Sequence, residues 1–363
     1  MNKIINLFSI LFLTISVLSS CNTDEPDLFP SDLVKGAYLI NYGSFGNGGA
    51  SISKFDYEKN EITNKFYGNQ NDGLELLSNI QYAYAYKDSI YLLGNNSDQI
   101  IVVNPLFQQS KNAIIESSIS KPRFCIADGD YLYISCWGAD ADFSEMANTY
   151  ICKFNTKTQK VEANISVPGG PEGMVITDGK LYAALNYKDS IAVLDLTASS
   201  IGYIAVPAVS SYLVKDVKGN IYATQVSTWS DYSSETGLAY INTATNNYIK
   251  TFPLDGVSSE YGSILCMNND MTQIYLLASQ YDENWNLSGT LFQFDMVSES
   301  YTEFVGGISG PKGVSVNPVD GKIYVLSAES VTEGGSLQIY DEKGTLENQF
   351  STGISPIMCL FLN

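Results

Sequence analysis

None of the 363 residues is histidine, which limits the chemistry that the side chains of this sequence can carry out. A Ser-His-Asp triad, a Cys-His pair and a histidine metal site are therefore excluded. The loop acids Asp140, Asp142 and Glu145 could in principle perform acid–base chemistry or bind Ca²⁺. Their spacing fixes no geometry, however, and it lacks the glycine and terminal glutamate of an EF-hand loop. We expect a binding protein without catalytic residues, metal or cofactor.

Aromatic residues in loops are the second group with chemical potential. Trp137, Trp229 and Trp285 each lie in a polar loop that follows an apolar, strand-like run, as in "YISCWGADADFSEM". A single tryptophan in such a place more often fills a gap in a core. Three on the same kind of loop favour a recognition surface, because rigid amphipathic rings beside Asn, Ser and Asp combine apolar area with polar orientation.

A sequence repeat must position these loops. An apolar strand ending in Asp or Asn, followed by a polar turn, recurs with a period of about 47 residues. Each of these side chains can accept a hydrogen bond from its own backbone two residues further on, which starts a tight turn between antiparallel strands. The seven positions are Asp56, Asn104, Asn155, Asp195, Asn242, Asp295 and Asp341.

The repeat predicts an all-β fold, a seven-bladed β-propeller of four-stranded blades. Phrases such as "TDGKLYAAL" indicate a hairpin turn inside each unit, so each unit has four strands, which we call a to d. Residues 36–68 supply only strands b, c and d, and "SPIMCLFLN" at the C-terminus supplies the missing strand a, which closes the ring. The even spacing and this split blade disfavour the alternative, a two-domain β-sandwich. The other units are expected at 76–116, 121–167, 170–206, 209–254, 258–307 and 310–353.

The register of the repeat predicts one ligand-binding face. In a propeller the b–c and d–a loops emerge on the same side, and the long b–c loops hold all three tryptophans. The d–a loops add Arg123, Glu172, Glu260 and Lys312, whose charges could reach the central mouth. Asn95 and Asn186 lie in b–c turns and could equally serve as turn formers. The predicted ligand-binding residues are Tyr42, Phe45, Asn95, Arg123, Trp137, Asp142, Phe143, Asn186, Tyr187, Trp229, Tyr232, Tyr261, Tyr281 and Trp285.

The N-terminus has the pattern of a processed lipoprotein. Lys3 precedes a short apolar stretch that is typical of a signal peptide, residues 1–20. It ends in Leu-Ser-Ser-Cys, which resembles a lipobox with lipidation at Cys21. The acidic residues that follow resemble the surface-export signal of Bacteroidetes lipoproteins, and 21–35 is expected to be a polar tether. The other five cysteines lie in apolar runs and are interpreted as buried hydrophobes.

The charge of the chain also restricts its partners. The formal net charge is −19, which would repel a polyphosphate over most of the surface. We therefore expect no nucleic acid partner. An acidic surface is instead consistent with a protein that must stay soluble outside the cell.

The two end segments carry a family resemblance. "YLINYGSFGNGGASISKFDYEKNEI" and "GVSVNPVDGKIYVLSAESVTEGG" resemble the YncE-like seven-bladed β-propeller lipoproteins of Bacteroidetes, and within them the BtuG-type cobalamin-capturing surface lipoproteins. The resemblance covers about residues 36–363, although Tyr42 stands where relatives often have an acid. It implies a lipid-anchored protein at the outer-membrane cell surface that captures a corrinoid, delivers it to a TonB-dependent outer-membrane transporter and caps that transporter.

The residues themselves are compatible with this function and leave alternatives open. A corrinoid is a broad, partly apolar ring fringed with amides, which suits a rim of Trp and Tyr with Asn and Ser. Because histidine is absent, cobalt cannot be ligated through imidazole, so we expect recognition of the ring periphery. The alternatives are a propeller that binds another nutrient, such as a glycan, and a structural or adhesive surface protein.

Overall fold

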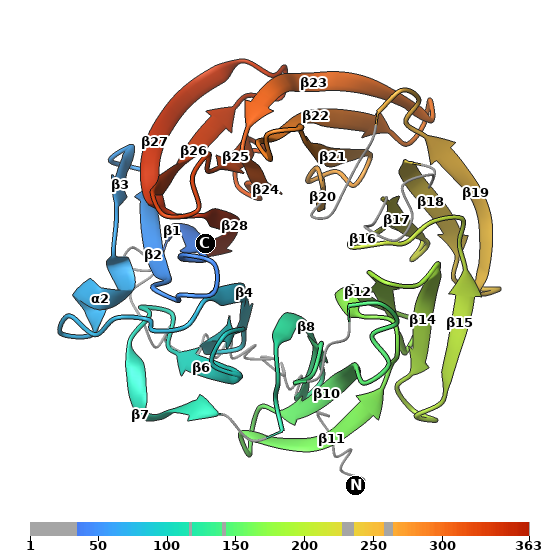
Figure 1. Cartoon of the computed structure of the whole chain (residues 1–363), viewed down its shortest axis with the longest axis horizontal. Helices are drawn as coiled ribbons and strands as arrows, with labels where there is room; N and C mark the ends of the chain where they lie inside the picture. The colour runs from blue at the N-terminus through green and yellow to red at the C-terminus, as the bar shows by residue number, and fades with distance from the viewer. Residues whose placement is uncertain (1–34, 116–117, 140–142, 227–235, 258–263, 363) are drawn as a thin grey trace, which may run out of the picture.

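Seven four-stranded antiparallel sheets form a closed ring around a central opening (Figure 1). The structure is a computed structural model, and it describes residues 35–115, 118–139, 143–226, 236–257 and 264–362. The propeller fold predicted from the repeat is therefore confirmed, and the two-domain sandwich is excluded. Among the residues described, no helix is long and apolar enough to cross a membrane.

The first blade is the split one, and its strands come from both ends of the chain. From the channel outward they are β28 (Pro356–Leu362), β1 (Gly36–Asn41), β2 (Ser51–Asp56) and β3 (Glu61–Thr63). The register of β1 against β28 pairs Leu39 with Cys359. This antiparallel pairing closes the ring as the sequence predicted, and it satisfies two strand edges that would otherwise be open.

The other six blades follow one another along the chain, each with its first strand at the channel and its last at the periphery (Figure 1). Blades two to four are β4 (Ile80–Tyr86), β5 (Ser89–Gly94), β6 (Gln99–Val103), β7 (Gln109–Ile115); β8 (Pro122–Asp128), β9 (Tyr131–Cys136), β10 (Tyr150–Asn155), β11 (Lys160–Ser166); and β12 (Pro171–Thr177), β13 (Lys180–Leu185), β14 (Ser190–Asp195), β15 (Ile201–Ala205). Blades five to seven are β16 (Leu213–Lys215), β17 (Ile221–Gln225), β18 (Gly237–Asn242), β19 (Asn247–Pro253); β20 (Ile264–Met267), β21 (Gln273–Tyr281), β22 (Leu287–Asp295), β23 (Ser300–Ser309); and β24 (Pro311–Val316), β25 (Ile323–Ser327), β26 (Gly334–Tyr340), β27 (Leu346–Ile354).

The repeated Asp and Asn side chains close the c–d turns, as predicted. Asp195 Oδ1 accepts hydrogen bonds from the backbone N–H groups of Thr197 and Ala198, at 2.9 and 2.7 Å. The same bond two residues on is present at Asp56, Asn104, Asn155, Asp295 and Asp341, and Asn242 accepts from Thr245 instead. Because each bond stabilises the carboxylate, the pKa of Asp195 lies below its ordinary value.

The hydrophobic core lies between the blades, not inside a single centre. Strand side chains alternate between two faces, and each face packs against a neighbouring blade. Tyr38, Tyr182, Tyr275 and Tyr324 occur near the start of strand b in four blades and are almost fully buried there. Free Cys125, Cys136, Cys152 and Cys359 are buried among these clusters, which confirms their interpretation as small hydrophobes, whereas the fifth, Cys266, is only half-buried.

One element differs from its predicted type. Residues 61–68 were expected to form a whole strand d, but β3 ends at Thr63 and a short helix, α2 (Phe66–Gln70), follows. Its side chains fill the gap between blades one and two, where Tyr67 is 2% exposed and the Phe66 ring lies 5.4 Å from that of Tyr38. The inter-blade contact, not the strand pattern, therefore determines the local conformation.

Candidate ligand-binding site

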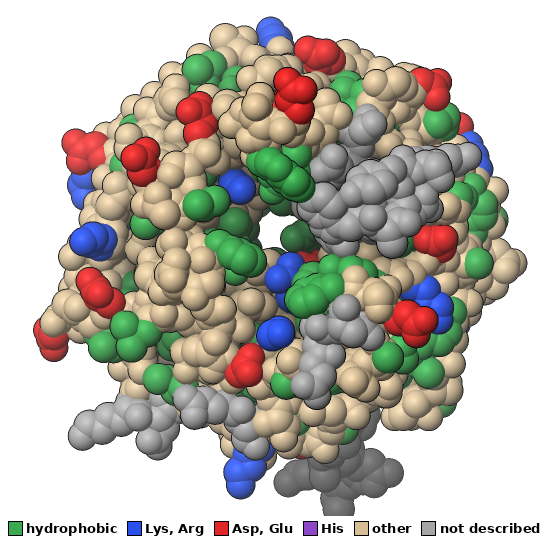
Figure 2. Space-filling view, in the orientation of Figure 1, with side chains coloured by type: hydrophobic (Ala, Val, Ile, Leu, Met, Phe, Trp, Pro, Cys, Tyr) green, Lys and Arg blue, Asp and Glu red, His purple; other side chains and the backbone are tan. Residues whose placement is uncertain are grey.

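The b–c loops and d–a connections meet on one face of the ring, as the repeat predicted. The backbone N–H of Trp137 in a b–c loop donates to the carbonyl of Lys121 in a d–a connection at 3.1 Å. Tyr187 and Gly169 make the same contact in the next blade at 3.0 Å. The view in Figure 2 shows hydrophobic side chains together with Lys and Arg around the central opening.

A cavity of about 540 Å³ occupies the central channel, within the size range of small-molecule sites. Its walls come from all seven blades, because the innermost strands β4, β8, β12, β20, β24 and β28, and the residues just before β16, all contribute. Predicted ligand residues Arg123, Trp137, Asn186 and Tyr281 line it. Gln81, Tyr82, Glu172, Tyr212 and Lys312 also line it but were absent from that set.

A recurrent β-bulge directs side chains into this channel. In β4, β8 and β24 the pairing register shifts by one residue at Gln81, Arg123 and Lys312, and β12 and β28 show the same shift near Glu172 and Ile357. A bulge leaves one residue without a cross-strand partner and re-aims its side chain. All five of these side chains line the cavity. Arg123, Glu172 and Lys312 thus lie at the second residue of a strand, not in the d–a loops where they were predicted.

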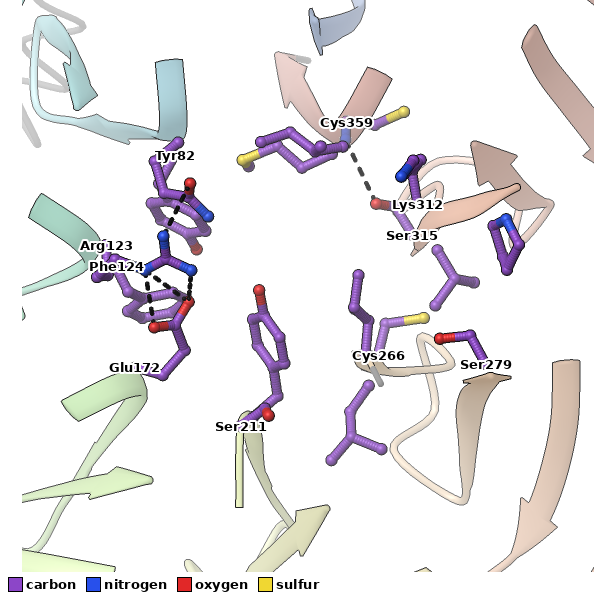
Figure 3. Close-up of a pocket in the computed structure, with 18 of the residues that line it drawn as sticks. Tyr82, Arg123, Phe124, Glu172, Ser211, Cys266, Ser279, Lys312, Ser315 and Cys359 are labelled. Carbon is purple, nitrogen blue, oxygen red and sulfur yellow. Dashed lines mark hydrogen bonds and ion pairs between the residues drawn. The ribbon is translucent and has the colours of Figure 1, made fainter. Parts of the chain in front are cut away.

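An ion pair forms one wall of the channel, seen in Figure 3. Arg123 Nη2 and Nε donate to Glu172 Oε1 and Oε2 at 2.8 and 2.9 Å, and Arg123 Nη1 donates to Gln81 Oε1 at 3.2 Å. The side chains are 18% and 4% exposed, so the pair is largely removed from water. Burial disfavours the guanidinium charge, yet the carboxylate of Glu172 outweighs this and raises the pKa of Arg123.

Trp137 packs on this ion pair. Its ring centre lies 4.1 Å from Arg123 Cζ, and its Nε1 donates to the carbonyl of Pro171 at 3.2 Å. Phe143 and Tyr187 contact it edge to face, with ring centres 6.4 and 5.7 Å away. These three rings are called the Trp137 cluster. It is both a wall of the cavity and, through Phe143, which is 59% exposed, part of the outer face.

A second aromatic group lies on blade six, in the segment from Tyr281 to Leu287 that joins β21 to β22, here called the Trp285 hairpin. Its tip is held by Asp282 Oδ1, which accepts from the backbone N–H groups of Asn284 and Asn286 at 2.8 Å. Trp285 has φ +63° and is 67% exposed, with its ring 5.9 Å from that of Tyr281. Tyr281 and Leu287 line the cavity, whereas Trp285 is not among the lining residues.

The remaining predicted residues have mixed placements. Asn186 is 4% exposed and accepts from Ser211 Oγ at 2.7 Å beside the cavity. Asn95 Nδ2 donates to the carbonyl of Pro122 at the start of β8 at 3.1 Å, so its amide links blades two and three, and Asn95 is not among the cavity-lining residues. Tyr42 is half-buried, and burial raises its pKa while the charge of Arg123 opposes the rise. Phe45 is 77% exposed at the tip of its loop and does not line the cavity.

Some predictions fall outside the part of the chain that the structure describes. These are the signal peptide and tether, lipidation at Cys21, the charge of Glu260, and the ligand residues Asp142, Trp229, Tyr232 and Tyr261. Sequence reasoning noted Glu172 and Lys312 without selecting them. A signal was present, because Arg123, Glu172 and Lys312 each follow a proline that begins an innermost strand.

Comparison with known proteins assigns a family and a fold. The family described as "Domain of unknown function (DUF5074)" matches residues 35–352. No curated protein matches the chain. A quinoprotein alcohol dehydrogenase-like protein from Bacteroides thetaiotaomicron is similar in structure, with a TM-score of 0.66, 16% identity, and 91% of this chain and 79% of that one covered. Dihydro-heme d1 dehydrogenase NirN is also similar in structure, with a TM-score of 0.59 and 9% identity, and 93% of this chain and 77% of that one are covered.

A third similar structure is hydrazine synthase from Kuenenia stuttgartiensis, with a TM-score of 0.57 and 13% identity over 70% of this chain and 73% of that one. At such identities the likeness shows the propeller fold alone. Propellers of this shape include enzymes, so the fold by itself does not distinguish a binding protein from a catalyst.

Proposed function

The chain belongs to the family described as domain of unknown function DUF5074, and we propose that it is a surface lipoprotein that captures cobalamin or a related corrinoid. In this proposal it is anchored in the outer membrane through Cys21 and passes its ligand to a TonB-dependent transporter. The sequence resemblance to BtuG-type capture proteins suggests this activity. The composition of the channel mouth supports it.

The observation that carries the proposal is a cavity whose walls combine aromatic rings with two carboxamide side chains. Trp137 and Tyr281 supply flat apolar area, and Gln81 and Asn186 supply carboxamides at the same opening. A corrinoid needs both, because its ring is broad and partly apolar while its edge carries amides. The cavity of about 540 Å³ is smaller than a whole corrinoid, so the macrocycle would lie across the mouth with one substituent in the channel.

The channel chemistry favours binding of the ligand edge over ligation of its metal. Histidine is absent, and the sulfur atoms near the cavity belong to Met267, Met358, Cys266 and Cys359. Burial raises the pKa of the Cys266 and Cys359 thiols well above the ordinary value, so both remain protonated and are poor ligands. We therefore propose that the protein recognises the corrin periphery and leaves the cobalt to other ligands.

The proposed anchor requires a tether between the membrane and the ring. The first strand begins at Gly36, and the proposed lipidated residue is Cys21. A fully extended segment of that length would reach about 50 Å.

A glycan is the second candidate ligand, and the Trp285 hairpin favours it. Trp285 is 67% exposed and lies beside Tyr281, and exposed flat rings of this kind can stack on sugar faces. This candidate predicts binding of an oligosaccharide without any affinity for cobalamin. A purely structural role predicts that neither ligand binds.

The test is a titration of the chain from Ser31 onward, which keeps all seven blades, with cyanocobalamin. Binding is read from quenching of tryptophan fluorescence and confirmed by calorimetry. We expect saturable binding that Trp137→Ala weakens at least tenfold, while Trp285→Ala, the matched control on the other aromatic group, weakens it less than threefold. No binding at micromolar protein would exclude the corrinoid function and direct the same titration to glycans.

A further inference from the structure

The charged side chains that point into the central channel do not balance. Among the described lining residues they are Arg123, Glu172 and Lys312. Arg123 and Glu172 form the bidentate ion pair described above, so their charges cancel. Lys312 is left as the remaining charge, so the described lining residues together carry a positive charge. This is notable in a chain whose formal net charge is −19.

Lys312 is held where a ligand would enter. It occupies the bulge position of β24, and Figure 3 places it across the cavity from the Arg123–Glu172 pair, next to Ser315. It is half-buried, and no carboxylate of the described residues lies within ion-pair distance of its Nζ. Among the described residues, the nearby Ser315 Oγ accepts only a long contact from the Cys359 backbone N–H at 3.5 Å.

An ammonium that no described carboxylate compensates is costly to place in a partly buried channel. Removal from water lowers the pKa of Lys312, because burial disfavours the charged form. The other basic side chains near this mouth are differently placed, since Arg123 has its carboxylate and Lys121 lies over the exposed Phe143 ring at 6.0 Å, outside the cavity lining. A cation that faces a ligand-sized cavity and has no ion-pair partner among the described residues is therefore best explained by a ligand of opposite charge.

We infer that the central channel binds an anionic group, a carboxylate or a phosphate, carried by the captured ligand, with Lys312 as its counter-ion. An ammonium acts on such groups as a compact point charge, and the Ser315 hydroxyl can donate a hydrogen bond to the same oxygen atoms. The free N–H positions of Arg123 that Glu172 and Gln81 do not use can contribute from the opposite wall. The acidic outer surface would repel such a ligand elsewhere, which adds selectivity for the channel.

This inference deepens the proposed capture function and rests on it in taking the cavity as the ligand site. It specifies that the preferred ligands are those with a substituent that ends in an anion and is long enough to enter the channel. Neutral ligands of the same size would be bound less tightly. Lys312 would attract an anionic group whether or not the ligand carries a macrocycle.

The test uses the chain from Ser31 onward with its lysines reductively methylated with ¹³C, which preserves their charge. The signals of Lys312 and Lys121 are assigned by their loss in Lys312→Met and Lys121→Met. Inorganic phosphate and acetate are titrated separately at constant ionic strength, with chloride as the balancing anion. We expect the Lys312 signal to shift saturably, with half-saturation in the millimolar range, and its pKa to rise on binding.

Lys121 is the internal control, because it is a cation on the same face outside the cavity. Its signal should follow ionic strength only. Equal responses of both lysines, or no response of Lys312 to either anion, would overturn the inference. A response to acetate alone assigns a carboxylate, and a response to phosphate alone assigns a phosphate.

The outcome is separable from that of the capture proposal. If the anions bind at Lys312 while cyanocobalamin does not bind, the anion site stands and the corrinoid function falls. If cyanocobalamin binds while Lys312 is silent toward both anions, the reverse holds. Lys312→Arg and Lys312→Met carry no Lys312 signal, so their binding of phosphate and acetate is measured by calorimetry. Lys312→Arg, which keeps the charge, should retain binding and Lys312→Met should lose it, and an unchanged urea-unfolding midpoint of Lys312→Met excludes misfolding as the cause.

Discussion

The Trp137 cluster and the Trp285 hairpin have the same kinds of residues on the same kind of loop, yet they are built differently. Trp137 contacts Arg123, donates a hydrogen bond to Pro171 and lines the cavity. Trp285 is 67% exposed in a left-handed backbone conformation and does not line it. One ring is a wall of the channel, and the other is displayed at the tip of a hairpin.

This difference shows that loop position alone does not define a binding residue. The Trp137 cluster belongs to a network that runs through the buried ion pair to the inner strands of blades three and four. The Trp285 hairpin is held by hydrogen bonds that the Asp282 carboxylate accepts from residues within four positions along the chain. The first group should couple ligand binding to the stability of the ring, whereas the second should act locally.

The largest expected effect comes from breaking the ion pair under Trp137. Glu172→Gln keeps the shape of the side chain but leaves Arg123 as an unpaired, largely buried charge, which should lower the free energy of unfolding by about 3 kcal/mol. Glu299→Gln is the matched control, because its partner Lys250 and Glu299 are both exposed and the loss should stay below about 1 kcal/mol. Urea denaturation measures the free energy of unfolding of both variants. Equal losses would contradict the view that burial makes the Arg123–Glu172 pair more important for stability than the exposed pair.

Truncation of the tryptophan itself should have the next largest effect. Trp137→Ala removes a half-buried ring and its contact with Arg123, and we expect a loss of about 2 kcal/mol, less than for a fully buried tryptophan. Trp137→Phe keeps a ring over Arg123 but loses the hydrogen bond to Pro171, which should lower the free energy of unfolding by about 1 kcal/mol. If thermal or urea unfolding shows Trp137→Phe to be less stable than Trp137→Ala, the ring is not packed on Arg123 as described.

The hairpin should tolerate the same truncation. Trp285→Ala removes a mostly exposed side chain, so the free energy of unfolding should change by no more than about 0.5 kcal/mol. The measurement is the same urea denaturation as for Trp137→Ala. A loss as large as that of Trp137→Ala would erase the distinction between the two aromatic groups.

Acid should loosen the hairpin while the Trp137 cluster stays ordered. Hydrogen bonds from the side chain and backbone of Asn286 and from Asn284 hold the pKa of Asp282 below its ordinary value. Because the folded pKa is the lower one, the stabilisation is present above the unfolded value of about 3.9 and is lost as the pH falls through the folded pKa. The indole N–H resonances of Trp285 and Trp137 report the two sites separately in NMR spectra.

Only the Trp285 resonance should move strongly in that pH window. Asp282→Asn, which cannot ionise, should abolish the movement. A simultaneous shift of both resonances would instead indicate a change of the whole ring, to which other turn carboxylates with lowered pKa, such as Asp295 and Asp341, would contribute.

Local patterns carried most of the fold prediction. The Asp and Asn residues at the c–d turns predicted the period, because their hydrogen bonds reach only two or three residues along the chain. The split blade was predictable because strand a was missing at one end of the chain and present at the other. The helix at Phe66–Gln70 was missed, since its aromatic side chains are placed by contacts with Tyr38 and Phe107 on two different blades.

The sequence by itself therefore determined the number of blades, the closure of the ring and the face on which the aromatic loops emerge. Each follows from signals that act within one repeat or that compare one repeat with the next. Only the tertiary structure decided which side chains share the channel. A bulge shifts Gln81, Arg123 and Lys312 out of the strand register, and the ring then brings together residues from every blade that are up to hundreds of positions apart in the chain. The physical reason is that no short-range sequence signal specifies the central channel. Its lining is defined only when all seven blades have packed around the axis.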